Sequence, residues 1–515
     1  MKSPVSPTRT IPALLDRCEA QYGPVDLFRW REREEIRSLT YARFAQETRA
    51  LAADIDARVP ARAHIAIVGE NSYQWLLCWF ATLCAGCVAV PLDPQLPTAD
   101  LLALLEKSGA ALLFYAAGYE DAAAAFGQAV PMRDAPVLLA PYEGAAGWPC
   151  AVQPDDLGMI VYTSGTTGEP KGVMLSHWNF LTSILSGGRR VGLAGQSTLA
   201  VLPFHHTLGL GPGLLAHLPG GSTVGICGGI RHLMKDLAVF HPEHMVVVPL
   251  LAEGMYRKIW DTARKEKKDK LLRAMLGLSG ALLKVGIDLR RRLFKSVLAA
   301  FGDELKGILC AGAPVAEECV SGFPCFGVMV LTGYGTTECA PAVTMHGWER
   351  QKAHSVGPVL DCNEVRIAED GEILVKGDNV FLGYYEDEEA TREAFTADGW
   401  YKTGDLGYLD GDNFLYITGR KKNLIILSNG KNVSPEGLEQ KLLEIPFIKE
   451  ALVYESGGEI AAELYLDPEA PQAAAGLEEA LLALNRLLPA YQRITKTVLR
   501  DTEFPKTTTK KIKRR

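Results

Sequence analysis

The chain has 515 residues, of which 48% are hydrophobic and 22% are charged, and its formal net charge is −7. This length predicts roughly two to four folding units, and the composition is that of an ordinary globular protein. The acidic balance excludes a basic nucleic-acid-binding domain, and the sequence contains neither a low-complexity tract nor an internal repeat.

The N-terminus, MKSPVSPTRTIPALL, contains prolines and lacks an apolar run long enough for a signal peptide, so we expect a cytoplasmic protein. Eleven cysteines are scattered along the chain, an odd number that predicts reduced thiols in this setting. Cys84 and Cys87 form a C-x-x-C pair without a second pair in register. We interpret them as buried small residues and not as zinc ligands.

Apolar strands alternate with helices up to about residue 340, which predicts an α/β fold of mostly parallel βαβ sheets. The uncharged run from Trp75 to Leu92 is interrupted by Gly86 and Pro91, so it predicts a buried helix and a short strand instead of a membrane span. The predicted strands are HIAIVG (64–69), VAVPL (88–92), ALLFY (111–115), MIVYTS (159–164), TLAVLPF (198–204), HMVVVPLL (244–251) and GILCAGAP (307–314).

The stretch YTSGTTGEPKGVMLSH, residues 162–177, is the first candidate for chemistry. It lacks the residue order of a nucleotide-hydrolase P-loop, and it lacks the dinucleotide pattern G-x-G-x-x-G. Its glycines let backbone N–H groups converge, and its hydroxyls and lysine add donors, which suits a phosphate. The alternative is an ordinary polar turn between a strand and a helix. The residues concerned are Thr163, Ser164, Gly165, Thr166, Thr167, Gly168 and Lys171.

From about Gly357 the pattern changes to short strands and Gly/Asp turns, which predicts hairpins or a small β-barrel-like subdomain. After Arg420 the chain reads as a strand, a helix (435–445), two strands (450–455 and 459–466) and a helix (476–488), a compact α+β unit. We place the boundary after Lys421, which divides the chain into a large domain, 1–421, and a small domain, 422–515.

Six further stretches are as distinctive as the opening loop. They are LPFHHTLG (202–209), CAGAPV (310–315), GYGTTE (333–338), WYKTGDLG (400–407), GRKKNLIILSNGKNVSPEGLE (419–439) and PKTTTKKIKR (505–514). With the loop, and in this order, they resemble the adenylate-forming superfamily of AMP-dependent synthetases and ligases, which includes acyl-CoA synthetases, peptide-synthetase adenylation domains and luciferases. The resemblance extends from about residue 10 to the C-terminus. LPFHHT and GRKKNLIILSNGKNVSP look most like bacterial long-chain fatty-acid–CoA ligases.

The resemblance implies an enzyme that uses ATP, Mg²⁺ and coenzyme A. A carboxylate attacks the α-phosphate of ATP, pyrophosphate leaves, and a thiol then attacks the acyl adenylate. Charge that spreads over the phosphates requires backbone donors, a metal and a lysine. By resemblance, Thr163 and the following residues to Gly168 wrap the β- and γ-phosphates while Lys171 supports the loop. Glu338 is the implied magnesium ligand and Thr337 lies beside the α-phosphate.

The nucleoside is assigned in the same way. Tyr334 stacks on adenine against a backbone of small residues, Asp405 accepts the ribose hydroxyls, and Arg420 adds a second contact. A core aromatic is the alternative interpretation of Tyr334, and an Asx turn that of Asp405. The remaining residues assigned to the nucleotide are Gly312, Ala313, Pro314, Gly335 and Thr336.

Lys511 is the implied catalytic lysine, carried on a tail that enters and leaves the site. The family pattern has glycine where this chain has Lys510, and we favour Lys511 by register. Lys422 is the implied hinge of a mobile C-terminal lid domain, where many relatives carry aspartate. Rotation about it exchanges Lys511 for a loop that lines the thiol tunnel near Gly430.

The acyl pocket is predicted after LPF, where HHTLGLGPGLLAHL contains no carboxylate. Amino-acid-activating relatives need an aspartate there, because a buried unpaired ammonium is costly. A fatty or other apolar acid is therefore favoured. His205 or His206 is expected to gate this pocket. The alternative is a histidine with a purely structural role, held by hydrogen bonds. The glycines assigned to the pocket are Gly209, Gly211, Gly213 and Gly333.

Three alternatives stay open: a fatty-acyl-AMP ligase that loads a carrier protein, a stand-alone amino-acid adenylation enzyme, and a non-catalytic nucleotide-binding protein. The expected partners are a small carboxylic acid and either coenzyme A or a carrier protein. We expect no nucleic-acid partner, and we expect a monomer or a homodimer. Basic stretches from Arg257 and Asp288 are interpreted as solvated helix faces, or as contacts with anionic lipid at a membrane surface or with the phosphates of a large cofactor.

Overall fold

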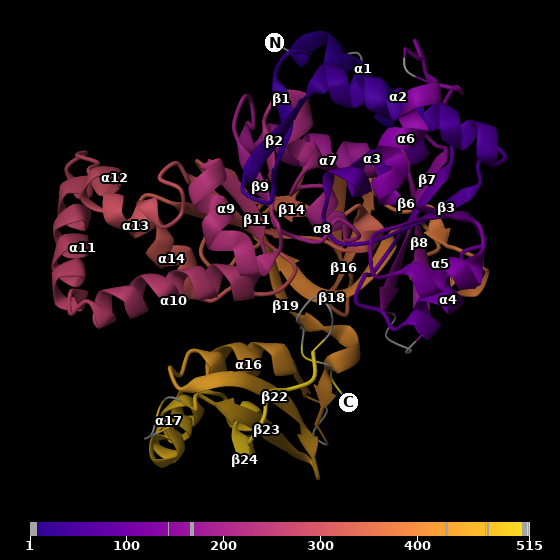
Figure 1. Cartoon of the computed structure of the whole chain (residues 1–515). Coiled ribbons are helices and arrows are strands. Elements are labelled where there is room, and N and C mark those ends of the chain that lie inside the picture. Colours follow the sequence, from indigo (N-terminus) through magenta and orange to yellow (C-terminus); the bar gives the residue numbers. More distant parts are fainter. Residues whose placement is uncertain are drawn as a thin grey trace.

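The computed structural model describes residues 8–142, 144–164, 169–427, 431–468, 470, 473–506, 512 and 514. Within these residues the strands form five sheets, of eight, seven, four, three and two strands. The two large sheets and their helices make up most of the molecule (Figure 1). The fold is α/β, as expected. Residues after Arg420 form a separate lobe, which lies below the rest in Figure 1.

The seven-stranded sheet has the order β17-β8-β7-β4-β3-β5-β6. Strands β7, β4, β3, β5 and β6 are parallel, and β8 and β17 add an antiparallel edge. The parallel strands are apolar runs because a parallel sheet is covered on both faces. Strand β8 was not predicted. The strands are β3 (His64–Val68), β4 (Val88–Leu92), β5 (Ala110–Tyr115), β6 (Ala129–Pro131), β7 (Leu157–Ser164), β8 (Pro170–Ser176) and β17 (Gly383–Tyr384).

The eight-stranded sheet has the order β14-β13-β12-β11-β9-β10-β1-β2. Strands β13 to β1 in this order are parallel, and β14 and β2 are antiparallel at the two edges. The hairpin β1–β2 and strand β10 were not predicted. The strands are β1 (Asp26–Glu32), β2 (Glu35–Thr40), β9 (Thr198–Ala200), β10 (Val224–Ile226), β11 (His244–Val247), β12 (Gly307–Cys310), β13 (Met329–Tyr334) and β14 (Thr344–Met345).

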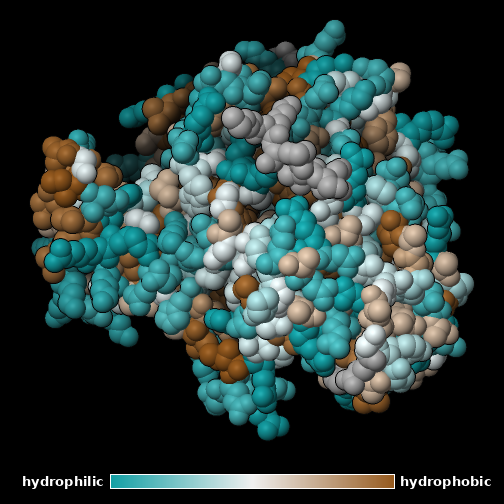
Figure 2. Space-filling view, turned by 90° about the horizontal axis from the view of Figure 1, so that it is seen from above, coloured by the Kyte–Doolittle hydropathy of each residue, from teal (hydrophilic) through white to brown (hydrophobic). Residues whose placement is uncertain are grey.

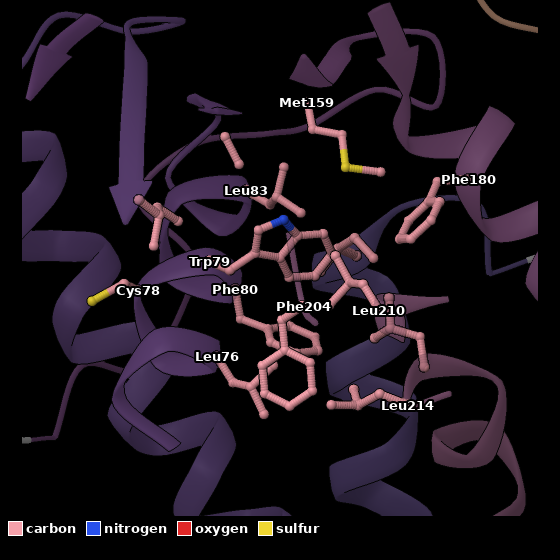
Figure 3. Packing of buried hydrophobic residues seen from close by; sticks show 14 of the residues in the cluster. Leu76, Cys78, Trp79, Phe80, Leu83, Met159, Phe180, Phe204, Leu210 and Leu214 are labelled. Carbon is pink, nitrogen blue, oxygen red and sulfur yellow. The ribbon is translucent and has the colours of Figure 1, made fainter. Parts of the chain in front are cut away.

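Helix α3 is the centre of the main core. Eleven of its twelve residues are buried, as expected for a helix that is apolar on every side. Figure 3 shows Trp79 and Phe80 of α3 packed among Phe180, Phe204 and Leu210. The apolar run from residue 75 to 92 is thus a buried helix followed by β4, as predicted. No helix within the described ranges combines the length and hydropathy that crossing a bilayer requires.

The helices around the two sheets are α1 (Ile11–Tyr22), α2 (Tyr41–Arg58), α3 (Tyr73–Cys84), α4 (Thr98–Lys107), α5 (Glu120–Phe126), α6 (Ala135–Leu139), α7 (His177–Val191), α8 (Thr207–Leu210) and α9 (Leu233–Phe240). All eleven cysteines are free thiols, and Cys84 and Cys87 are buried, as predicted.

A helical arm projects from the eight-stranded sheet, on the left in Figure 1. The predicted strand 244–251 was too long: β11 ends at Val247, and Pro249 begins a helix. Proline suits the first turn of a helix because the N–H it lacks has no partner there. The arm consists of α10 (Pro249–Lys265), α11 (Asp269–Lys284), α12 (Arg290–Leu293) and α13 (Lys295–Ala299); α14 (Glu317–Cys325) lies against its base.

The expected hairpins after Gly357 form an open four-stranded antiparallel sheet, in the order β15-β16-β18-β19, in place of a closed barrel. Its elements are β15 (Asn363–Ile367), β16 (Glu372–Gly377), β18 (Tyr401–Leu409) and β19 (Leu415–Arg420), with α15 (Glu388–Ala394) beside it.

The C-terminal lobe has its own hydrophobic cluster, which includes Ile425, Val433, Leu442 and Leu464. The expected helices and strands are present, and an additional strand, β24, pairs in parallel with β23. A 3₁₀ turn, η6 (Lys421–Asn423), joins β19 to this lobe. The lobe contains β20 (Ile425–Ile426), β21 (Asn432–Val433), α16 (Pro435–Leu443), β22 (Ile448–Ser456), β23 (Glu459–Leu466), α17 (Ala473–Leu487) and β24 (Ile494–Arg500).

Candidate active site

Several of the candidate residues follow the carboxyl ends of parallel strands. Gly312 to Pro314 follow the end of β12, and Tyr334 ends β13, which is the neighbouring strand. His205 and His206 follow β9, and a Cβ built on Gly312 would lie 3.6 Å from Leu208 of the next helix. In open α/β sheets the crevice outside the carboxyl ends of the strands is where ligands bind.

Tyr334 and Asp405 are joined by a hydrogen bond across two sheets. The phenol of Tyr334 donates to Oδ2 of Asp405 at 2.7 Å. Oδ1 of Asp405 forms an ion pair with Nε of Arg420 at 2.8 Å, and the two residues face each other in the strand pair β18–β19. Asp405 is only 4% exposed. Burial and the Asp405 carboxylate raise the pKa of Tyr334 well above its ordinary value, so the phenol stays protonated and donates.

Glu338 lies in a 3₁₀ turn, η5 (Thr337–Cys339), directly after the GYGTT segment. Its Oε1 accepts a hydrogen bond of 3.0 Å from the phenol of Tyr384 in β17. Burial and Glu338 both raise the pKa of Tyr384, which keeps that phenol a donor. Nζ of Lys171 lies 5.0 Å from the centre of the Tyr384 ring, a cation–π distance. Tyr384 therefore links the carboxylate to the strand that follows the predicted phosphate loop.

The donor set around Glu338 fits a magnesium ion that is shared with phosphates. No group of three or more His, Cys, Asp or Glu side chains that could hold a metal occurs among the described residues. Mg²⁺ commonly binds one or two carboxylates together with phosphate oxygens and water. A single carboxylate such as Glu338 is sufficient for that mode, with the nucleotide supplying the other oxygens.

Gly335 has a steric requirement. A Cβ at this position would lie 1.8 Å from the carbonyl oxygen of Pro341, closer than any real contact. The backbone at Gly335 therefore lies too close to the backbone at Pro341 for any residue with a side chain. This proximity holds Thr336 and Thr337, both half-buried, between Tyr334 and Glu338.

The phosphate loop connects two strands and does not lead directly into a helix. Thr163 of β7 pairs with Lys171 of β8, and α7 begins only after β8, at His177. The side chain of Ser164 and residues Gly165, Thr166, Thr167 and Gly168 lie outside the described residues, as do Gly430, Lys510 and Lys511.

His205 is buried, and its Nε2 lies 3.7 Å from Oδ1 of Asp93, beyond hydrogen-bond distance. Burial, with His206 adding to it, lowers the pKa of His205 well below its ordinary value, so the imidazole is neutral. The rings of His205 and His206 are 4.2 Å apart. His205 therefore lies within the protein, beside the half-buried His206.

The glycines after His206 are explained by the backbone itself. A Cβ on Gly209, Gly211 or Gly213 would lie 2.3, 2.8 or 2.5 Å from a carbonyl oxygen of the neighbouring turn. A Cβ on Gly333 would lie 3.1 Å from the carbonyl oxygen of Thr344. Their lack of a side chain thus has a structural reason that does not depend on a ligand.

Lys422 lies in the turn η6 between the two lobes, and burial together with Arg420 and Arg514 lowers its pKa. Arg514 donates to Oε2 of Glu439 at 2.5 Å and to the carbonyl of Val453 at 3.2 Å, so Arg514 is held against α16 and β22. The described end of the tail is therefore close to the predicted hinge.

Tyr384 was missed by the sequence interpretation. The only local signal is a pair of tyrosines in FLGYY (381–385) between turn residues. Its partners Glu338 and Lys171 are 46 and more than two hundred positions away, so no local pattern reveals the contact.

Fold and site together define a nucleotide-dependent enzyme, in which a buried carboxylate and a tyrosine meet at the carboxyl edge of a parallel sheet. Residues 18–385 match the model of a protein family that is described as "AMP-binding enzyme". The chain belongs to this AMP-binding enzyme family.

Relatives over most of the chain agree with this assignment. The long-chain-fatty-acid–CoA ligase FadD15 of Mycobacterium bovis is 32% identical over 470 residues, which are 84% of this chain and 78% of that protein. A 3-[(3aS,4S,7aS)-7a-methyl-1,5-dioxo-octahydro-1H-inden-4-yl]propanoyl:CoA ligase of Rhodococcus jostii is 28% identical over 477 residues, 86% of this chain and 85% of that one.

The fold is also that of a solved structure, o-succinylbenzoate CoA synthetase of Bacillus subtilis in complex with its acyl-adenylate intermediate. It has a TM-score of 0.78 and 24% identity, and the match covers 97% of this chain and 96% of that one.

Proposed function

We propose that the chain is an AMP-forming acyl-CoA synthetase that activates a fatty or other apolar carboxylic acid with ATP and transfers the acyl group to coenzyme A. The observation that carries the proposal is the set of contacts between Tyr334, Asp405 and Arg420, beside Glu338 and Lys171. It brings a flat ring and two carboxylates to one edge of the fold, which supports a nucleotide site with a ribose contact and a metal contact.

We assign Asp405 to the ribose. Its two carboxylate oxygens contact the Tyr334 phenol and the Arg420 guanidinium, and a carboxylate oxygen accepts more than one hydrogen bond. The partners of Asp405 hold its side chain in place before the nucleotide binds. Little side-chain conformational entropy is therefore lost on binding.

Glu338 would hold the magnesium ion, and that ion would supply charge stabilisation for the phosphates. The Tyr384 phenol fixes the orientation of that carboxylate, and Lys171 adds positive charge on the neighbouring strand. Thr163, Ser164 and the loop to Gly168, with Gly312 to Pro314, complete the nucleotide contacts. The residues of the chain thus bind, orient and neutralise, and the acid supplies the nucleophile.

We also propose that the protein works as two units, 1–421 and 422–515, with Lys422 at the hinge and Lys511 as the lysine that enters the site during adenylation. The separate cluster around Leu442 and the short turn at Lys422 support this division. By the family resemblance, we assign the loop near Gly430 to the thiol tunnel of the second arrangement.

Pyrophosphate exchange tests the lysine assignment. Lys511→Ala is expected to lower acid-dependent exchange by about a hundredfold or more, since it removes a charge that acts on the reacting phosphate. Lys510→Ala is the matched control, and its exchange should stay within about twofold of the wild type. Equal exchange in all three proteins would refute the role of Lys511.

The thiol acceptor is tested by a panel of carboxylic acids with ATP and either coenzyme A or a carrier protein, with AMP release as the readout. Acyl transfer to coenzyme A is the expected outcome. Transfer only to the carrier protein would establish the fatty-acyl-AMP ligase alternative. AMP release with amino acids as the only active substrates would establish the amino-acid adenylation enzyme. Absence of AMP release with every acid would refute the enzyme proposal.

The helical arm supports a proposal about membranes. Between Arg257 and Lys295 the sequence has thirteen Lys and Arg against four Asp and Glu, although the whole chain is acidic. Leu271, Leu278 and Val285 are seven positions apart on α11 and its end and are 58%, 56% and 71% exposed. Figure 2 shows hydrophobic residues gathered at the outer end of the arm beside hydrophilic ones. We propose that this face rests on an anionic membrane surface, where such helices insert apolar side chains below basic ones.

Vesicle sedimentation tests the arm. Leu278→Glu with Val285→Glu is expected to abolish binding to vesicles of phosphatidylcholine and phosphatidylglycerol, and salt should weaken wild-type binding. Leu482→Glu with Leu487→Glu, on exposed positions of α17, is the matched control and should bind as the wild type. Absence of wild-type binding would refute the proposal, and loss of a dimer in the arm variant would assign the face to a second copy of the chain.

A further inference from the structure

A narrow cavity of about 50 Å³ lies between α7 and the eight-stranded sheet. Most of its lining is apolar, and it is formed by α7, by strands β11 to β14 and by the segment before β10. Representative lining residues are Ile184, Gly187, Leu309, Leu331, Met345 and Trp348.

The cavity begins behind the candidate active site. Leu331 is two residues before Gly333 in β13, and Gly333 pairs with Met345 of β14. Ala342, another lining residue, follows the segment that begins at Glu338. In the function proposed above, on which this inference rests, the carboxylate is activated at the carboxyl edge of the sheet. The far end of the acid would then enter this cavity, whose volume of about 50 Å³ suits a small terminal group.

Two histidines interrupt the apolar lining. His217 comes from a 3₁₀ turn, η3 (Leu215–Gly220), and His244 begins β11; they are 2% and 7% exposed. Among the described residues, neither Nδ1 of His217 nor Nε2 of His244 has a hydrogen-bond partner. A buried polar atom without a partner is costly, so these nitrogens call for an explanation.

Both imidazoles are neutral. Burial lowers the pKa of His217 to about 3, with His244 adding to the shift, and burial lowers the pKa of His244 to about 4. A neutral imidazole has one N–H donor and one acceptor nitrogen. The pair can therefore offer a donor, an acceptor or both to an uncharged group, but it provides no charge for a carboxylate.

The histidines lie at the end of the cavity that is remote from the nucleotide. His244 pairs with Gly307 at the amino end of β12, whereas Gly312 follows the carboxyl end of the same strand. Five residues of extended chain correspond to about 17 Å. A group that reaches His244 from the active site is thus at the far end of the acid.

We infer that the acid carries an uncharged oxygen function, a hydroxyl or a carbonyl, at the end remote from its carboxylate, and that His217 and His244 bind this oxygen. A plain hydrocarbon end would leave both nitrogens unpaired. Sites that are built to hydrogen-bond a substrate group discriminate strongly against analogues that lack it.

Matched acids of equal length, with a methyl, hydroxyl or keto group at the far end, test the inference. The readout is the ratio of kcat/KM values for AMP release, which does not depend on the fraction of folded enzyme. The wild type should prefer an oxygenated acid by about tenfold or more. His217→Leu and His244→Leu should each reduce that ratio towards one. The hydroxy and keto acids separate the two oxygen functions.

His177→Leu is the control, because His177 is also buried but accepts from the Ile11 N–H and does not line the cavity. It should leave the ratio unchanged. Equal or better use of the methyl acid by the wild type, with ratios unaffected in both cavity variants, would overturn the inference while leaving the enzyme proposal intact. No AMP release with any acid would overturn both.

Discussion

At the scale of single residues, Asp405 is the most constrained of the candidate groups. It is buried between a phenol and a guanidinium, and both oxygens already accept a hydrogen bond or ion pair. A buried carboxylate is tolerated only when it is paired in this way. Its position therefore depends on Tyr334, which is distant in the sequence, and on Arg420, which faces it in the neighbouring strand.

Asp405→Asn is expected to raise the KM for ATP about tenfold or more, because the amide keeps one acceptor and loses the charge that pairs with Arg420. Steady-state kinetics with varied ATP measures this effect. Asp410→Asn is the control, since Asp410 pairs with Lys352 away from the site. An unchanged KM in the Asp405 variant would contradict the ribose assignment.

At the scale of elements, the segment from β13 through η5 places Tyr334 and Glu338 within four residues of each other. This geometry requires Gly335, because the backbone at Pro341 occupies the space of a Cβ. The sequence motif GYGTTE was recognisable without a structure. The steric reason for its second glycine was not, since Pro341 approaches only through the turn that follows.

Gly335→Ala is expected to destabilise the fold by about 1–3 kcal/mol and to displace both neighbouring side chains, because a carbonyl oxygen cannot move as a flexible side chain can. Urea unfolding and AMP release measure the two effects. Gly411→Ala is the control, as nothing lies within 4 Å of a Cβ at that turn position. Equal stability of the two variants would show that the backbone at Pro341 relaxes freely.

At the scale of the whole molecule, several histidines are buried and neutral. Burial lowers the pKa values of His177, His244 and His346 to about 4 and that of His217 to about 3. Each group has an ordinary pKa near 6.5 when unfolded, so the unfolded state binds more protons as the pH falls below that value. Stability is thus fully present above about pH 6.5 and decreases from there towards pH 4.

Urea unfolding between pH 7.5 and 5 measures this loss, which we expect to be up to about 1.4 kcal/mol per pH unit for each such histidine. His177→Gln is expected to flatten the dependence, because glutamine does not titrate in this range and its amide oxygen is still an acceptor for the Ile11 N–H. A stability that is constant over this range would contradict the neutral, buried state of these groups.

The alternation of apolar strands and helices, the buried run around Trp79 and the ordered motifs determined the α/β class and the family from the sequence alone, because these patterns are local along the chain. Strands β8 and β24 escaped prediction, and β11 was made too long, since pairing with distant strands decides where such short runs begin and end. Only the tertiary structure brought Tyr384 to Glu338 and placed His217 and His244 in one cavity. Contacts of this kind depend on how separate elements pack, which no local pattern of residues records.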